Sequence, residues 1–190
     1  MTNMKLNRKG FTLIELLAVI TILGILMIVG IPAVQRTINN SRRDTFLDTA
    51  KEYANSVKTA WAADEIICTD GTRATGAAAG DYEIWFDTAA SDAAVNSISA
   101  PTGATPTQNK ERLIQSGGKS SWGTNDVIGY VKVNINSGNP KYYVYISDAK
   151  GHGTVAASDA TEADRLTRND IKDKDAVIPT TSGTICNIEE

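Results

Sequence analysis

Few residues of this chain stand in a pattern that could support catalysis. The 190-residue sequence contains a single histidine, His152, which lies between two glycines. A histidine without a neighbouring cluster of Cys, Asp or Glu is a poor general base or metal ligand, and the flanking glycines favour a tight turn. No serine occurs in the G-x-S-x-G pattern that exposes a nucleophile on a strand-to-helix turn. The sequence therefore predicts no catalytic residue and no enzyme.

Two further segments imitate ligand-binding motifs. Gly117-Gly118-Lys119-Ser120 resembles the end of a phosphate-binding loop, but Leu113 stands where G-x-x-x-x-G-K-S requires its first glycine. The run from Asp170 to Asp175 holds three aspartates that could bind calcium, yet its interleaved lysines are typical of a solvated charged surface. We therefore expect no cofactor and no metal site.

The overall charge excludes one class of partner. With 19 basic and 22 acidic residues, the formal net charge is -3. Surfaces that bind nucleic acid usually carry a basic excess, so no nucleic-acid partner is predicted.

The two cysteines, Cys68 and Cys186, nearly bracket the polar part of the chain. Cysteines of an exported domain tend to pair, and such a bridge would contribute roughly 2–4 kcal/mol. A disulfide is the favoured interpretation, and two free thiols are the alternative.

One carboxylate lies in a long apolar run. Between Phe11 and Val34 there are 24 residues, and Glu15 is the only charged one. As a helix this run would span roughly 36 Å, enough to cross a bilayer core of about 30 Å. It is longer than the apolar core of a secretory signal, so a membrane helix is favoured over a cleaved signal peptide. An isolated acid in such a helix is costly, which points to a function for Glu15.

A basic leader that ends in glycine precedes this run. Lys9-Gly10-Phe11-Thr12-Leu13-Ile14-Glu15, followed by Leu16-Leu17-Ala18-Val19-Ile20, resembles the N-terminus of type IV pilins, pseudopilins and competence pilins. The resemblance covers about Lys5 to Ile38. It implies the α+β pilin fold, in which one long N-terminal helix packs on a small antiparallel β-sheet.

The sequence pattern supplies the boundaries of such a fold. Apolar residues recur every three or four positions between Phe46 and Trp61, so one helix is predicted from near Phe11 to about Ala63. Alternation predicts a strand over 82–86 and a hairpin over 127–135 and 141–146. We expect a leader at 1–10, a membrane or filament-core half of the helix at 11–34, an amphipathic half at 35–65 and a β-rich head at 66–190.

The resemblance also implies a life cycle. A prepilin peptidase would cut between Gly10 and Phe11 and methylate the new Phe11 amine. The single-pass membrane precursor would be polymerised by an assembly ATPase and an inner-membrane platform protein into an extracellular, homopolymeric filament, a fimbrium of the kind used in adhesion or twitching motility. In that filament, Glu15 would pair with the Phe11 amine of a neighbour.

Three residues weaken the apolar helix. Gly24 and Gly30 lower helix propensity, and Pro32 removes one helix hydrogen bond. Local unwinding there is expected to let a filament stretch, and a simple kink is the alternative.

Other functions remain open at this point. A major pilin is the first hypothesis, since the polar, Thr- and Ala-rich head suits a filament surface. A type II secretion pseudopilin, a competence pilin or a minor pilin would share the same N-terminus. A membrane-anchored monomeric binding domain is the alternative from a different class, because a plain anchor needs neither cleavage nor Glu15.

Overall fold

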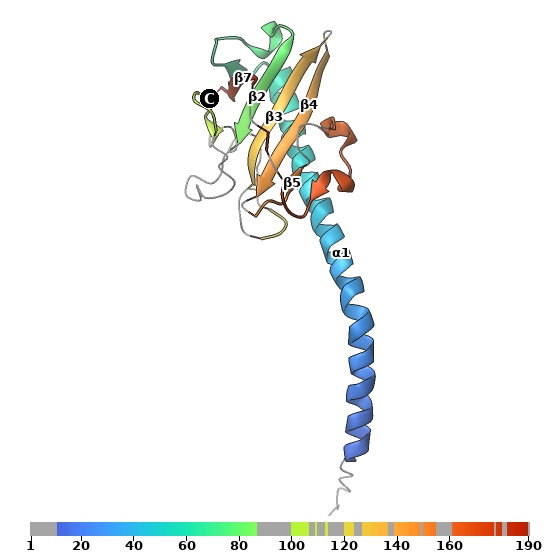
Figure 1. The fold of residues 1–190 in the computed structure, drawn as a ribbon. Helices are drawn as coiled ribbons and strands as arrows, with labels where there is room; N and C mark the ends of the chain where they lie inside the picture. The colour runs from blue at the N-terminus through green and yellow to red at the C-terminus, as the bar shows by residue number, and fades with distance from the viewer. Residues whose placement is uncertain are drawn as a thin grey trace, which may run out of the picture. The chain divides into compact units, whose positions relative to one another are not determined.

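The computed structural model describes residues 11–86, 100–106, 109, 113, 120–123, 127–136, 139–148, 150–154, 161–176, 178–179 and 182–189. They form one long helix and one β-sheet, which confirms the α+β class expected from the sequence (Figure 1). The chain divides into two compact units, Met1–Asn40 and Ser41–Glu190.

Helix α1 runs from Leu13 to Ala62 and contains Pro32. Its bounds lie within two residues of those predicted. In the second unit its buried positions recur every three or four residues: Phe46, Ala50, Tyr53, Ala54, Val57, Ala60 and Trp61. This spacing places them on one face of the helix, and that face packs on the sheet.

The described residues form a sheet of seven strands in the order β1-β7-β2-β3-β4-β5-β6. Their bounds are β1 Ile66–Cys68, β2 Gly80–Phe86, β3 Val127–Asn136, β4 Asn139–Asp148, β5 Gly153–Thr154, β6 Ile171–Lys172 and β7 Thr184–Ile188. Short 3₁₀ turns occur at η1 Ala74–Gly76, η3 Ala163–Arg165 and η4 Arg168–Asp170. Strands β2, β3 and β4 form the long central part of the sheet (Figure 1).

The sheet differs from the expected antiparallel one at a single pair. Strand β7 runs parallel to β2, with Glu83 opposite Ile185, and antiparallel to β1. A parallel neighbour needs a long crossover connection. Here the part of the chain that contains β3 to β6 lies between β2 and β7 in the sequence and supplies that connection. The sheet is therefore mixed.

The β3–β4 hairpin confirms the alternation seen in the sequence. Its register runs from Val127 opposite Asp148 to Asn136 opposite Asn139. Gly129 has a φ of +146°, and a Cβ there would lie 2.0 Å from the backbone oxygen of Tyr145. Only glycine permits the two strands to approach so closely at this point.

The sheet has an apolar cluster on each face. On the α1 face, Tyr53 packs on Phe86 with ring centroids 4.7 Å apart, and both are fully buried. On the opposite face, the ring of Tyr130 lies between those of Trp85 and Tyr145, at centroid distances of 4.7 and 5.0 Å. Each buried aromatic side chain contributes roughly 2–3 kcal/mol by leaving water.

Two bidentate ion pairs join α1 to the segment 168–173. In one pair the arginine lies on α1, and in the other it lies on that segment. Arg43 on the helix donates two hydrogen bonds to Asp173, both at 2.5 Å. Arg168 of η4 donates two to Asp44, the next residue of the helix, both at 2.6 Å. All four side chains are partly exposed, so these pairs fix the position of the helix more than they stabilise the fold.

Candidate functional site in the N-terminal segment

The first described residues of the chain carry most of the predicted site. Phe11 precedes α1 and is 91% exposed, while Glu15 lies in the first turn of the helix. Gly10 lies outside the described residues. The proposed cleavage point at Gly10 and Phe11 is therefore placed by the sequence pattern alone.

Thr12 and Glu15 form a reciprocal pair at the start of α1. The Thr12 backbone N–H and hydroxyl donate to Oε2 of Glu15 at 2.9 and 2.8 Å. In return, the Glu15 backbone N–H donates to the Thr12 hydroxyl oxygen at 3.3 Å. Because the helix begins at Leu13, Thr12 is the N-cap and Glu15 is the third helical residue, which is the arrangement of a capping box.

This pair holds one oxygen of the carboxylate and leaves the other open. Both bonds from Thr12 end on Oε2 of Glu15, and the described residues give Oε1 no donor. The cap thus fixes the direction of the side chain while one oxygen stays available to a further donor. Sequence reasoning missed the role of Thr12, although T-x-x-E before an apolar run is a recognisable helix-start signal.

The helix surface that follows is apolar and uncovered. Seventeen large apolar residues between Phe11 and Ile38 are exposed, each by 45% or more. Helix α1 is long and apolar enough to cross a membrane, and its most apolar stretch has none of its residues buried. Such a surface requires lipid or other helices around it.

The three helix-weakening residues lie in this surface. A Cβ added at Gly24 or Gly30 would have no atom within 4 Å outside its own stretch of helix, so packing within the chain does not require glycine at either position. Pro32 lies inside α1 and lacks the N–H that would bond the carbonyl four residues earlier.

A family model for the prokaryotic N-terminal methylation motif matches residues 5–31. This chain carries that methylation motif. The motif is typical of type IV pilins and pseudopilins, and the matched stretch includes Gly10, Phe11, Thr12 and Glu15. No curated protein and no solved structure matches the chain.

The methylation motif covers the leader and the first part of α1, and the head lies beyond it. It implies processing by a prepilin peptidase, and with the apolar helix it fits a membrane-anchored precursor. The pilins and pseudopilins of which this motif is typical are structural proteins.

In the head, the structure joins Cys68 to Cys186 in a disulfide, the pairing favoured by the sequence. The two residues are register partners on β1 and β7, and Cys186 also lies opposite Ile84 of β2. The bridge therefore ties the chain just after α1 to the central sheet through the last strand.

His152 lies beside an aspartate that sequence reasoning overlooked. Its Nδ1 is 2.7 Å from Oδ2 of Asp148, and the Ser120 hydroxyl donates to the same oxygen at 2.6 Å. The ring of Trp122 stacks on the imidazole, with centroids 4.6 Å apart. Hydroxyl and imidazole both bond the carboxylate, and the described contacts include none between them, so the arrangement is not that of a nucleophile and its base. It anchors the segments around Ser120 and His152.

The aspartates of the tail have separate partners. Asp170 accepts two hydrogen bonds from Thr167 at 2.8 Å, and Asp173 bonds Arg43. Within the described residues, no group of three or more His, Cys, Asp and Glu side chains is arranged to hold a metal.

Proposed function

We propose that this chain is a pilin, the repeating structural subunit of a type IV pilus. The observation that carries the proposal is the single carboxylate of Glu15 at the start of an exposed apolar helix, inside a methylation motif. A helix that serves only as an anchor gains nothing from a charge in its apolar part. A helix that packs against copies of itself can use that charge to choose its register.

Processing prepares the partner of this charge. Cleavage between Gly10 and Phe11 removes three basic residues and no acid, which changes 19 basic and 22 acidic residues to 16 and 22, a net charge of -6. It also creates a positive, N-methylated amine on Phe11, four residues before Glu15. A prepilin peptidase in the membrane would carry out both steps.

Assembly would then bring the two charges together between subunits. The Phe11 amine of one subunit approaches the open Oε1 of Glu15 on a neighbour, while Thr12 of the neighbour keeps holding Oε2. Charges buried among apolar helices require partners, so a subunit out of register is disfavoured. The attraction also draws each incoming subunit to the growing end.

The remainder of the cycle follows from the exposed helix. The processed subunit would wait in the membrane until an assembly ATPase and a platform protein drive it into the filament. There the apolar halves of α1 would form the core and the heads would cover the surface, outside the cell.

Fractionation of cells tests this proposal. Filaments sheared from cells that express the wild-type chain should contain it, whereas Glu15→Leu should be cleaved but stay in the membrane. The control Glu15→Leu/Leu16→Glu keeps the composition and moves the carboxylate by one position around the helix. It should fail to assemble as well, since the register of the charge is what matters.

The same experiment separates the alternatives. Processed wild-type chain that never appears in sheared filaments would favour a pseudopilin or a minor pilin. Unprocessed chain confined to the membrane would favour an anchored monomeric binding domain.

A further inference from the structure

Glu83 of β2 is a buried carboxylate that takes no part in the N-terminal site. The residue is only 2% exposed. Its Oε2 accepts a hydrogen bond from the indole N–H of Trp85 at 3.2 Å, and its Oε1 accepts the backbone N–H groups of Ser182 and Gly183 at 3.3 and 3.0 Å. A carboxylate removed from water is costly unless its oxygens accept such bonds. Two of these three donors lie near the end of the chain, so Glu83 holds that end in place.

The two backbone donors directly precede β7, which begins at Thr184. Strand β7 lies between β1 and β2 in the sheet and runs parallel to β2, with Ile185 opposite Glu83. The approach at Gly183 is close, because a Cβ there would lie 2.9 Å from Oε1 of Glu83 and 2.9 Å from the backbone oxygen of Asp81. A larger residue would push the chain away from Glu83. This contact therefore fixes the point at which the chain enters the sheet as β7.

The entry point of β7 decides where Cys186 lies. In the observed register, Cys186 is opposite Cys68 of β1 and Ile84 of β2. Cys186 belongs to the apolar cluster on the α1 face of the sheet, and its neighbour Ile185 belongs to the cluster on the other face. A slip of one residue would exchange these two side chains between the faces. The position of residues 182–183 on Glu83 thus places the sulfur of Cys186 beside Cys68.

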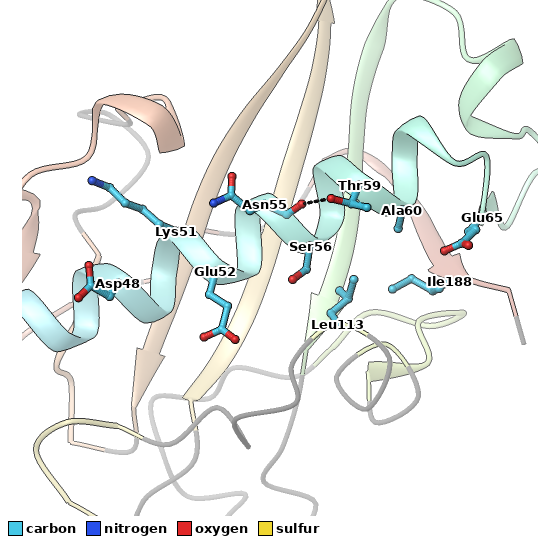
Figure 2. A pocket seen from close by; sticks show the side chains of 10 residues that line it. All are labelled: Asp48, Lys51, Glu52, Asn55, Ser56, Thr59, Ala60, Glu65, Leu113 and Ile188. Carbon is cyan, nitrogen blue, oxygen red and sulfur yellow. Dashed lines mark hydrogen bonds between the residues drawn. The ribbon is translucent and has the colours of Figure 1, made fainter.

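The far end of β7 is also held by a side chain. Asn109 is fully buried, its Oδ1 accepts the backbone N–H of Ile188 at 2.9 Å, and its Nδ2 donates to the backbone oxygen of Trp85 at 3.0 Å. The side chain of Ile188 lines a groove of about 570 Å³ beside α1, as Figure 2 shows. Glu83 and Asn109 therefore hold the two ends of β7, and neither contact requires the disulfide.

We propose that Glu83 positions β7 for closure of the Cys68–Cys186 disulfide. In the reduced chain, the bonds from residues 182–183 to Glu83 keep β7 in its place, so the two thiols are already neighbours when an oxidant arrives. Neighbouring thiols join more readily than thiols that must first be brought together, because the entropy of their approach has already been lost. Glu83 acts through the position of β7 and is a positioning residue in this step.

The closure itself is a thiol–disulfide exchange with an external disulfide such as oxidised glutathione. One cysteine thiolate attacks that disulfide and releases one thiol. The second cysteine thiolate attacks the mixed disulfide at the sulfur of the first cysteine and releases the other thiol. The chain loses two protons and two electrons, and the oxidant is reduced to two thiols.

A redox equilibrium of the purified full chain in detergent tests this role. The fraction of bridged chain at set ratios of oxidised to reduced glutathione gives the equilibrium constant for closure. Glu83→Ala should lower this constant by roughly tenfold, because β7 of the reduced variant leaves its place and must be brought back before closure. The control is Asp81→Asn, which changes a carboxylate of the same strand whose ion-pair partner is Lys132. It should leave the constant unchanged.

This readout separates positioning from a general loss of stability. A substitution that destabilises the oxidised and reduced folds equally leaves the equilibrium constant for closure as it was. Two further variants act on the same contact. Glu83→Gln keeps an oxygen that can accept both backbone bonds and should lie closer to the wild-type chain than Glu83→Ala does. Gly183→Ala keeps Glu83 but forces the chain away from it, and should lower the constant as Glu83→Ala does.

The outcomes decide the inference without reference to filaments. Wild-type equilibrium constants for Glu83→Ala and Gly183→Ala would overturn it, as would an equal fall for the control Asp81→Asn. If Glu83→Ala fails to fold, Gly183→Ala decides the question. Since no step of the experiment requires assembly, its result is independent of the proposed function.

Discussion

Thr12 and Glu15 bond each other in both directions at the start of α1, so the carboxylate that is proposed to guide assembly also caps its own helix. Thr12 is thereby a positioning residue, because its N–H and hydroxyl hold Oε2 of Glu15 at the helix start and leave Oε1 open. The two tasks of Glu15 can be separated by changing Thr12 alone.

Two substitutions at Thr12 separate the capping of α1 from the assembly role proposed for Glu15. Thr12→Ser keeps the hydroxyl and should assemble like the wild-type chain, whereas Thr12→Val loses the cap and weakens the start of the helix by about 1 kcal/mol. We expect the valine variant to be cleaved normally but to give fewer filaments. Quantifying processed chain in membranes and in sheared filaments measures this. Equal filament yields for the serine and valine variants would show that the cap has no part in assembly.

The second prediction concerns the extension of filaments. Replacing Gly24, Gly30 and Pro32 with alanine should strengthen the helix between them, since glycine and proline are its weakest residues. Filaments of the triple variant should then stretch less than wild-type filaments under the same force in single-filament pulling. The matched control is Ala18→Gly, which adds a glycine outside this segment. Unchanged extension of the triple variant would leave only a kink as the role of these residues.

The third prediction concerns the disulfide. Cys68 and Cys186 are 118 positions apart, and opening so long a loop should cost roughly 2–4 kcal/mol. The double variant Cys68→Ser/Cys186→Ser should therefore unfold at a clearly lower temperature than the oxidised chain in detergent. Reduction of the wild-type chain should have the same effect and should not change the variant. Coincident unfolding curves for oxidised and reduced wild-type chain would contradict a stabilising role.

Acid should weaken the anchor formed by Asp148. Burial opposes ionisation of this carboxyl, but hydrogen bonds from Ser120, the Lys150 backbone and His152 outweigh it, so its pKa lies below the ordinary 3.8. A carboxyl with a lowered folded-state pKa stabilises the fold above the unfolded value and loses that contribution as the pH falls through the folded value. We expect the unfolding temperature to be steady above about pH 5 and to fall below pH 4. Asp148→Asn should be less stable at neutral pH and should show a shallower acid loss.

Much of the fold could be predicted because its signals are local. The spacing of Phe46, Ala50, Tyr53 and Val57 indicated the buried face of α1, and the alternation after Val127 indicated the hairpin. Strand β6 is two residues long, and a pattern of that length carries no signal. The parallel pairing of β7 with β2 depends on contacts between residues about a hundred positions apart, which no local pattern encodes.

The candidate site could also be predicted where its signals are local. A lone acid after a glycine-ended basic leader is visible in the sequence, and the capping role of Thr12 could have been read from T-x-x-E. The groove beside α1 could not have been predicted, since Asp48 and Ile188, which both line it, come together only when the last strand joins the sheet.

The most direct test of the central claim is the intact mass and N-terminal sequence of the protein sheared from cells. We expect filaments whose chain begins at Phe11, carries one added methyl group on its amine and lacks the ten leader residues. A chain that still begins at Met1 and stays in the membrane would contradict both processing and assembly.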